Sequence, residues 1–167
     1  MGDTYVECMV KRTTGMGAKI FKYVLWFLVI FLGVTLFMIM GPSVSLFGMM
    51  LAGVGVYFYS IFMDVEYEYL YCDKTITVDK IYSQQRRKRV AVYELDKIEI
   101  IAPLNSHSLD DYKNRDVKET DYSSGVEQQP EVRYAFYYEG KQKIVFEPSE
   151  KMIKAMHDVA PRKVIQY

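Results

Sequence analysis

An uninterrupted run of apolar and small residues from Tyr23 to Met63 constrains this chain more than any other feature of its sequence. The run is 41 residues long and contains no Asp, Glu, Lys, Arg or His. Gly41-Pro42-Ser43 has the composition of a turn and divides it into Tyr23–Met40 and Val44–Met63. At about 1.5 Å rise per residue, each segment is long enough to cross a hydrocarbon core of about 30 Å. The stretch therefore predicts a transmembrane helical hairpin.

Both segments are also apolar enough to insert. The first contains twelve Leu, Ile, Val or Phe residues and the second contains nine. On an insertion scale these side chains contribute about −4 to −7 and −3 to −5 kcal/mol. A helical hairpin buried in a soluble protein would instead carry a polar stripe along each helix, and neither segment has one.

The hairpin divides the chain into an N-terminal tail (residues 1–22), the hairpin (residues 23–63) and a C-terminal domain (residues 64–167). The formal net charge is zero overall, +2 over residues 1–63 and −2 over the remainder. Neither part has the concentrated basic field that nucleic-acid binding requires, so we expect no nucleic-acid partner. Cys8 and Cys72 have neither a disulfide framework nor a metal-ligand spacing, and we expect no metal or cofactor.

Basic residues flank the hairpin on one side only. Lys11, Arg12, Lys19 and Lys22 precede it, whereas the turn between the two segments has no charge. The positive-inside rule places such a flank in the cytoplasm, and two crossings return the chain there. We therefore expect a multi-pass protein of the cell membrane with both termini and the C-terminal domain in the cytoplasm.

The N-terminal tail has two interpretations. Tyr5, Val6, Met9 and Val10 have helical spacing, which is typical of a short interfacial amphipathic helix. An unstructured tail is the alternative, because Thr13–Gly17 would interrupt a helix.

The second apolar segment has a face of small residues. Gly48, Ala52 and Gly55 lie at helical spacing, which allows two helix backbones to approach closely. The partner of this face is either the first segment, a second copy of the chain or another membrane protein.

The C-terminal domain begins with strand patterns and ends with a helix pattern. Apolar and polar residues alternate in Val65–Tyr71 and Thr75–Tyr82, and Glu139-Gly140-Lys141 forms a hairpin loop between two later apolar runs. Pro148-Ser149 begins an amphipathic helix that Ala160-Pro161 ends. The pattern predicts six or seven antiparallel strands followed by one helix.

This order of elements resembles the bacterial pleckstrin-homology-like (PH-like) domains. The segments Asp64–Tyr71, Arg87–Ile100, Ala102–Lys118 and Phe146–Val164 also resemble a family of small bacterial membrane proteins that have two transmembrane helices and no known function. The resemblance implies an α+β membrane protein, in which a transmembrane hairpin precedes an antiparallel β-sandwich or barrel closed by a C-terminal helix. It implies no catalytic residues.

A polar stretch from Pro103 to Pro130 is the first candidate site. Loops of this length are usually functional or disordered. Its candidate binding residues are Asn105, Ser106, His107, Asp110, Tyr112 and Arg115. The alternative is a surface excursion with a short helix and a further strand at Val117–Tyr122, anchored by apolar residues such as Leu109. Ser106, His107 and Asp110 are residue types of a hydrolase triad, but adjacent residues do not supply its geometry, so we do not expect an enzyme.

Arg86, Arg87, Lys88 and Arg89 form the second candidate site. They are either a docking site for anionic lipid headgroups, or charges that protect an edge strand from pairing with another sheet. Alternation along a strand would send them to two faces, which favours the second interpretation.

Together these features predict a membrane-anchored, cytoplasmic binding or scaffold module whose partners are membrane lipid and, in addition, a membrane protein or a second copy. One alternative is a structural subunit that joins a larger membrane complex through the second apolar helix. A less favoured alternative is an enzyme that uses residues 103–116.

Overall fold

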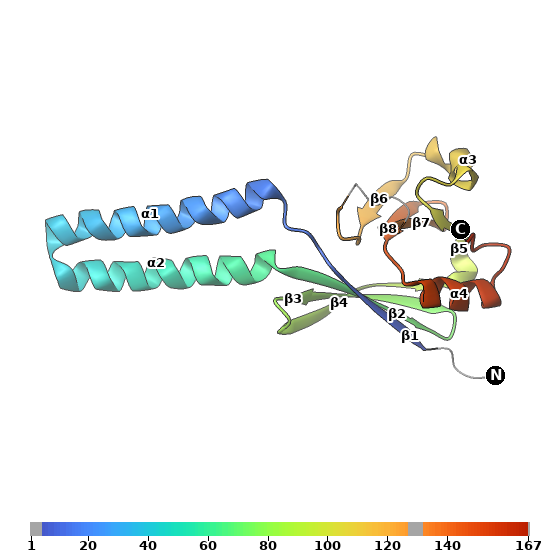
Figure 1. Ribbon diagram of the computed structural model, residues 1–167, viewed down its shortest axis with the longest axis horizontal. Helices are drawn as coiled ribbons and strands as arrows, with labels where there is room; N and C mark the ends of the chain where they lie inside the picture. The colour runs from blue at the N-terminus through green and yellow to red at the C-terminus, as the bar shows by residue number, and fades with distance from the viewer. Residues whose placement is uncertain (1–4, 127–131, 167) are drawn as a thin grey trace. The chain divides into compact units, whose positions relative to one another are not determined.

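The computed structural model describes residues 5–126 and 132–166. The chain forms two compact units (Figure 1). One comprises Thr14–Val65, and the other combines Met1–Thr13 with Glu66–Tyr167.

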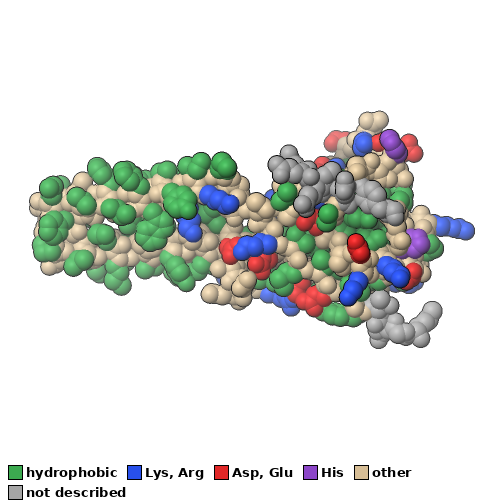
Figure 2. Space-filling view, in the orientation of Figure 1, with side chains coloured by type: hydrophobic (Ala, Val, Ile, Leu, Met, Phe, Trp, Pro, Cys, Tyr) green, Lys and Arg blue, Asp and Glu red, His purple; other side chains and the backbone are tan. Residues whose placement is uncertain are grey.

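The first unit is a helical hairpin. Helices α1 (Met16–Met40) and α2 (Pro42–Met63) run antiparallel, side by side (Figure 1). Gly41 has φ +86° at the turn, a left-handed conformation that favours glycine, and Pro42 occupies the first turn of α2, where its missing N–H costs nothing. Both helices are long and apolar enough to cross a membrane, and hydrophobic side chains cover their visible face (Figure 2). The two expected helices are confirmed, although α1 begins at Met16 and includes Lys19 and Lys22.

Small residues hold the two helices of the hairpin together. The Ser45 hydroxyl donates to the Gly33 carbonyl over 2.7 Å, and both residues are buried. A Cβ added to Gly48 would lie 3.1 Å from Leu36 of α1, so this glycine allows the close approach. A Cβ added to Gly55 would meet open space. Within the hairpin, Gly48 therefore faces α1, and Gly55 stands outside this contact.

The second unit begins with a four-stranded antiparallel sheet. Its order is β1 (Val6–Lys11), β2 (Val65–Cys72), β3 (Thr75–Tyr82) and β4 (Arg86–Glu94). Both interpretations of the N-terminal tail were wrong, because Val6–Lys11 pairs along β2 from Val6–Tyr71 to Lys11–Glu66. The segment has a period-2 pattern as well as a helical one, and the backbone of β2 selects the strand.

The second sheet also has four strands, in the order β5 (Ile98–Pro103), β7 (Tyr134–Tyr138), β8 (Gln142–Phe146) and β6 (Lys118–Asp121). The expected further strand at Val117–Tyr122 is confirmed as β6. It pairs parallel with β8, which corrects the expectation of a purely antiparallel domain. The chain leaves β5 at one edge of this sheet and returns at the other, after a short 3-10 turn (η2, His107–Leu109) and helix α3 (Asp110–Lys113).

The core lies between the two sheets and is closed by helix α4 (Glu150–Val159). Ser149 caps α4 by accepting a hydrogen bond from the Met152 amide, and Met152 and Met156 are buried. Aromatic rings fill the interior in edge-to-face pairs, such as Tyr69 and Phe136 against Phe146. The described part of the domain contains eight strands, two more than the lower expectation, because β1 and β6 join the sheets.

Candidate functional site

The turn between β3 and β4, residues 83–85, lies at a particular end of the first sheet. The Gln84 amide donates to the Glu66 carboxylate over 3.5 Å, and the Lys11 ammonium lies 3.8 Å from the same carboxylate. Lys11 is the last residue of β1, and Glu66 is the second residue of β2. Both covalent connections to the helical hairpin therefore leave the first sheet at the end that carries this turn.

Two residues of the basic run bind buried carboxylates. Arg87 forms ion pairs with Glu68 and, at 3.4 Å, with Asp79, and Arg89 lies 3.4 Å from Asp79. The side chains of Glu68 and Asp79 are only 2% and 4% exposed. A buried carboxylate is stable as an ion only if it is paired, so these two arginines have a structural task on this face of the sheet.

The other two residues of the run lie on the opposite face of the same hairpin. Arg86 pairs in register with Tyr82, and Lys88 with Lys80, so all four side chains lie on one face. Among the described residues, no carboxylate lies within ion-pair distance of Lys80, Arg86 or Lys88. We name these three residues the basic face. Sequence reasoning missed Lys80, although the alternation that starts at Ile76 and Val78 places it there.

The stretch after β5 covers the outer face of the second sheet. Leu109 is buried among Ala102, Ala135, Tyr137 and Val145. The Tyr112 ring packs on the Tyr137 ring, with centroids 4.9 Å apart. These contacts support the surface-excursion interpretation of this stretch.

Its polar side chains are engaged with close neighbours. The Ser106 hydroxyl accepts from the Ser108 amide, and the Lys113 ammonium donates to Asp110 over 2.6 Å. Hydrogen bonds from Lys113 and His107 lower the pKa of Asp110. Arg115 forms a 2.8 Å ion pair with Glu99 of β5, and Asn105 also has a partner.

None of the six candidate residues of this stretch lines either of the two cavities described in this structure. They belong to one surface element but do not converge on a common cavity.

Of those two cavities, one is a pocket of about 400 Å³ between α4 and the start of β7, lined by residues that include Tyr134 and Ile153. The other is a cleft of about 690 Å³ between β4 and β6.

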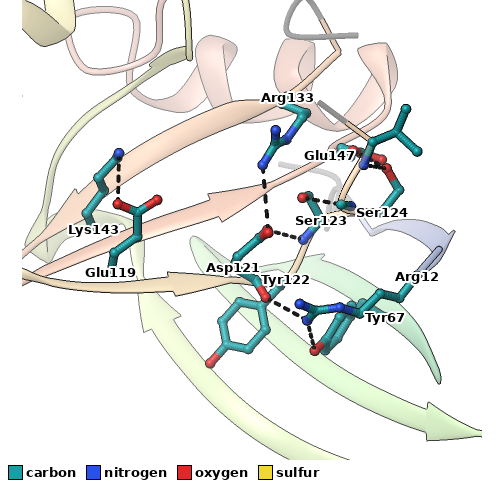
Figure 3. A network of polar contacts seen from close by, with 12 residues as sticks. Arg12, Tyr67, Glu119, Asp121, Tyr122, Ser123, Ser124, Arg133, Lys143 and Glu147 are labelled. Carbon is teal, nitrogen blue, oxygen red and sulfur yellow. Dashed lines mark hydrogen bonds and ion pairs between the residues drawn. The ribbon is translucent and has the colours of Figure 1, made fainter. Parts of the chain in front are cut away.

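A polar network secures β6 beside the first sheet (Figure 3). Arg12 donates to the Tyr67 hydroxyl over 3.0 Å and to the Asp121 carbonyl over 3.2 Å. The Asp121 carboxylate accepts from the Ser123 amide and lies 3.7 Å from Arg133. The segment that follows β1 is therefore connected to the end of β6.

Groups of three or more residues that suit a metal ion are absent from residues 5–126 and 132–166. Cys8 is half-buried and Cys72 is exposed, and both are free thiols.

Two four-stranded sheets closed by a C-terminal helix define the domain as PH-like. The chain belongs to the family described as Bacterial PH-like domain (DUF6106), whose model matches residues 2–166. The match includes the two apolar helices as well as the sheets, which confirms the resemblance inferred from the sequence. No curated protein and no solved structure matches the chain. A PH-like domain of unknown function is consistent with a binding or scaffold module.

Proposed function

We propose that this protein is a membrane-anchored binding module whose PH-like domain is held against an anionic cytoplasmic leaflet by Lys80, Arg86 and Lys88. One observation carries the proposal. The basic face has no carboxylate partner among the described residues, and it lies next to the turn at the end of the sheet from which both connections to the helices leave.

Helices α1 and α2 supply the anchor in this proposal. Their length and composition suit a membrane crossing, and Lys11, Arg12, Lys19 and Lys22 all precede or begin α1. With this basic flank on the cytoplasmic side, both termini and the PH-like domain are cytoplasmic. The basic face then meets the leaflet that carries anionic lipid.

The electrostatic gain is modest and depends on salt. Each Lys or Arg near an anionic leaflet contributes about 1 kcal/mol, so the basic face contributes about 3 kcal/mol. Arg87 and Arg89 contribute less, since Glu68 and Asp79 already offset their charge. At an ionic strength of about 1 M the Debye length falls to about 3 Å, and the attraction is lost.

The test uses the full chain in lipid nanodiscs. A fluorophore on Ser83→Cys, with Cys8 and Cys72 replaced by Ser, reports its distance to quenchers on the lipid headgroups. We expect stronger quenching in nanodiscs with phosphatidylserine than in pure phosphatidylcholine, and we expect an ionic strength of about 1 M to remove the difference. The triple variant Lys80→Gln, Arg86→Gln, Lys88→Gln should abolish it.

A matched control removes the same charge elsewhere. Lys151, Lys154 and Arg162 are exposed residues at or after α4. Their triple replacement by Gln should leave the quenching unchanged. Equal quenching in neutral and anionic nanodiscs would refute the docking proposal.

A further inference from the structure

The cleft between β4 and β6 lies between two strands that are each at the edge of a sheet. β4 is the last strand of the first sheet, and β6 is the last strand of the second. The cleft has a volume of about 690 Å³ and is lined by Val90–Tyr93 of β4 and by Lys118–Tyr122. An edge strand presents backbone groups that are ready to pair with another strand.

The pairing register of β3 and β4 shows which backbone groups of β4 are directed away from β3. The Leu95 amide donates to the Lys74 carbonyl over 2.7 Å, so the Leu95 amide is directed toward the β3 side of the hairpin. In an antiparallel ladder this direction alternates from one residue to the next, so the backbone amide and carbonyl of Tyr93 are directed toward Ile76 of β3. Val92 lies between Tyr93 and Ala91, and its amide and carbonyl are directed away from β3.

The same reasoning applies to β6. The Lys118 amide donates to the Lys141 carbonyl, and the Tyr122 amide donates to the Val145 carbonyl. The backbone groups of every second residue of β6 are therefore directed toward β8. Glu119 and Asp121 are directed away from β8. The Asp121 carbonyl already accepts a hydrogen bond from Arg12 (Figure 3), which leaves Glu119 as the outward backbone position of this strand.

The side chains along β4 divide it into two halves. Arg86–Arg89 carry charges that discourage pairing with another sheet. Val90 and Val92 have no charge and are 43% and 49% exposed. From Val90 to Tyr93 the strand is therefore an apolar edge without charged side chains.

Tyrosines from both sheets line the floor of the cleft. The Tyr93 ring packs edge-to-face on the Tyr138 ring, and its hydroxyl lies 3.5 Å from the Tyr122 hydroxyl. Rings of this kind give a broad apolar contact for side chains that enter the cleft.

We propose that this cleft binds an extended, acidic segment of a partner polypeptide, which adds to β4 as an antiparallel strand along Val90–Glu94. The apolar residues of the segment contact Val90, Val92 and the tyrosine floor. Its acidic residues lie toward the cations Lys88 and Lys118, which have no carboxylate partner among the described residues. Backbone hydrogen bonds supply affinity and alternate side chains supply selectivity.

A second copy of the chain fits this cleft less well. Its own edge strand would bring a whole sheet with it, whereas β6 forms a wall opposite β4. A single extended segment has no such neighbours. The proposal does not depend on lipid docking, because it rests on the edge of β4 and not on an anionic leaflet.

The experiment selects peptides from a phage-displayed random library on the full chain in nanodiscs of pure phosphatidylcholine, where lipid docking does not operate. We expect enriched peptides to alternate apolar with polar residues and to carry Asp or Glu at both ends. An antiparallel strand places its C-terminal end beside Lys88, and its N-terminal end beside Lys118. Resynthesised peptides should bind Val92→Pro at least about tenfold more weakly, because proline lacks the outward amide.

Val92→Thr is the matched control, since it keeps the amide, and it should retain binding. Val92→Pro should keep the β3–β4 ladder, because the lost amide is not part of it. If Val92→Pro unfolds, peptides with alternate N-methylated amides provide the same test on the unchanged protein, and their binding should be lost. Failure to enrich peptides would overturn the proposal. Peptide binding that survives both the Val92→Pro substitution and N-methylation of the peptide would also overturn the proposal. Self-association of the chain that Val92→Pro abolishes would overturn it as well.

Discussion

Arg87 forms an ion pair with Glu68, whose side chain is only 2% exposed, and so connects β4 to β2 across the intervening strand. Lys88 is the next residue along the strand, and no described carboxylate pairs with it. Neighbouring residues of one basic run therefore have different tasks, because a strand directs successive side chains to opposite faces.

This relationship predicts different costs for two similar substitutions. Arg87→Gln leaves the Glu68 carboxylate buried without its cation, and should lower the free energy of unfolding by about 3 kcal/mol. Lys88→Gln should change it by no more than about 0.5 kcal/mol. The measurement is chemical denaturation of the full chain in detergent, followed by near-ultraviolet circular dichroism of the buried tyrosines.

A second-site change checks the cause. Adding Glu68→Gln to Arg87→Gln should recover part of the lost stability, because it removes the buried charge. If the double variant is less stable than Arg87→Gln alone, the ion pair is not the reason for the loss.

The surface excursion after β5 allows a comparison of two of its candidate binding residues. Tyr112→Ala removes the ring that packs on Tyr137 and should cost about 2 kcal/mol of stability. His107→Ala should cost less than about 0.5 kcal/mol, since this side chain is fully exposed. The same denaturation measurement applies, and equal losses for both variants would contradict the anchoring role of Tyr112.

The glycines of α2 provide a matched pair within the hairpin. Gly48→Ile places a side chain against Leu36 and should lower the thermal stability of the helix pair in detergent. Gly55→Ile meets open space within the chain and should leave that stability unchanged. A change in crosslinked oligomers with Gly55→Ile would instead reveal a second helix at this position.

The two cysteines should differ in reactivity. Burial raises the pKa of the Cys8 thiol, whose Sγ lies 3.7 Å from the Glu147 carbonyl, whereas Cys72 is exposed. The thiolate is the reactive form, so iodoacetamide should modify Cys72 first at about pH 8.5, and Cys8 should react appreciably only at higher pH. Peptide mass spectrometry of the folded chain measures both rates.

The raised pKa of the Cys8 thiol also makes the stability of the fold depend on pH. Above about pH 8.5 the unfolded chain loses the Cys8 proton before the folded chain does, so stability from this group falls as the pH rises. Equal alkylation rates for the two thiols across this range would show that β1 does not hold Cys8 against the domain.

The proposed topology has a direct test. Reporter fusions at residue 1 and at residue 167 should both show cytoplasmic activity, because the basic flank precedes α1 and two helices follow it. An alkaline phosphatase fusion that is active at either end would contradict the arrangement.

Several elements were predictable from local pattern alone. The two apolar helices, the strands from Val65 to Tyr82 and the amphipathic helix after Ser149 all follow from periodicity and turn residues. Leu109 was also identified as an anchor of the surface excursion, because an apolar residue in a polar stretch usually packs against the domain.

The remaining features depend on partners that are distant in the sequence. Val6–Lys11 has a pattern compatible with a helix or a strand, and only the free edge of β2 decides between them. The parallel pairing of β6 with β8 likewise depends on where the chain returns after α3.

The sequence by itself determined that this protein has an apolar helical hairpin and a β-rich domain, because hydrophobic periodicity is a local property of the chain. Only the tertiary structure decided which cations of the basic run are neutralised, since Glu68 and Asp79 come from other strands. It also decided that β4 and β6 form the two walls of one cleft, because a strand lies at the edge of a sheet only when no further strand pairs with its outer side.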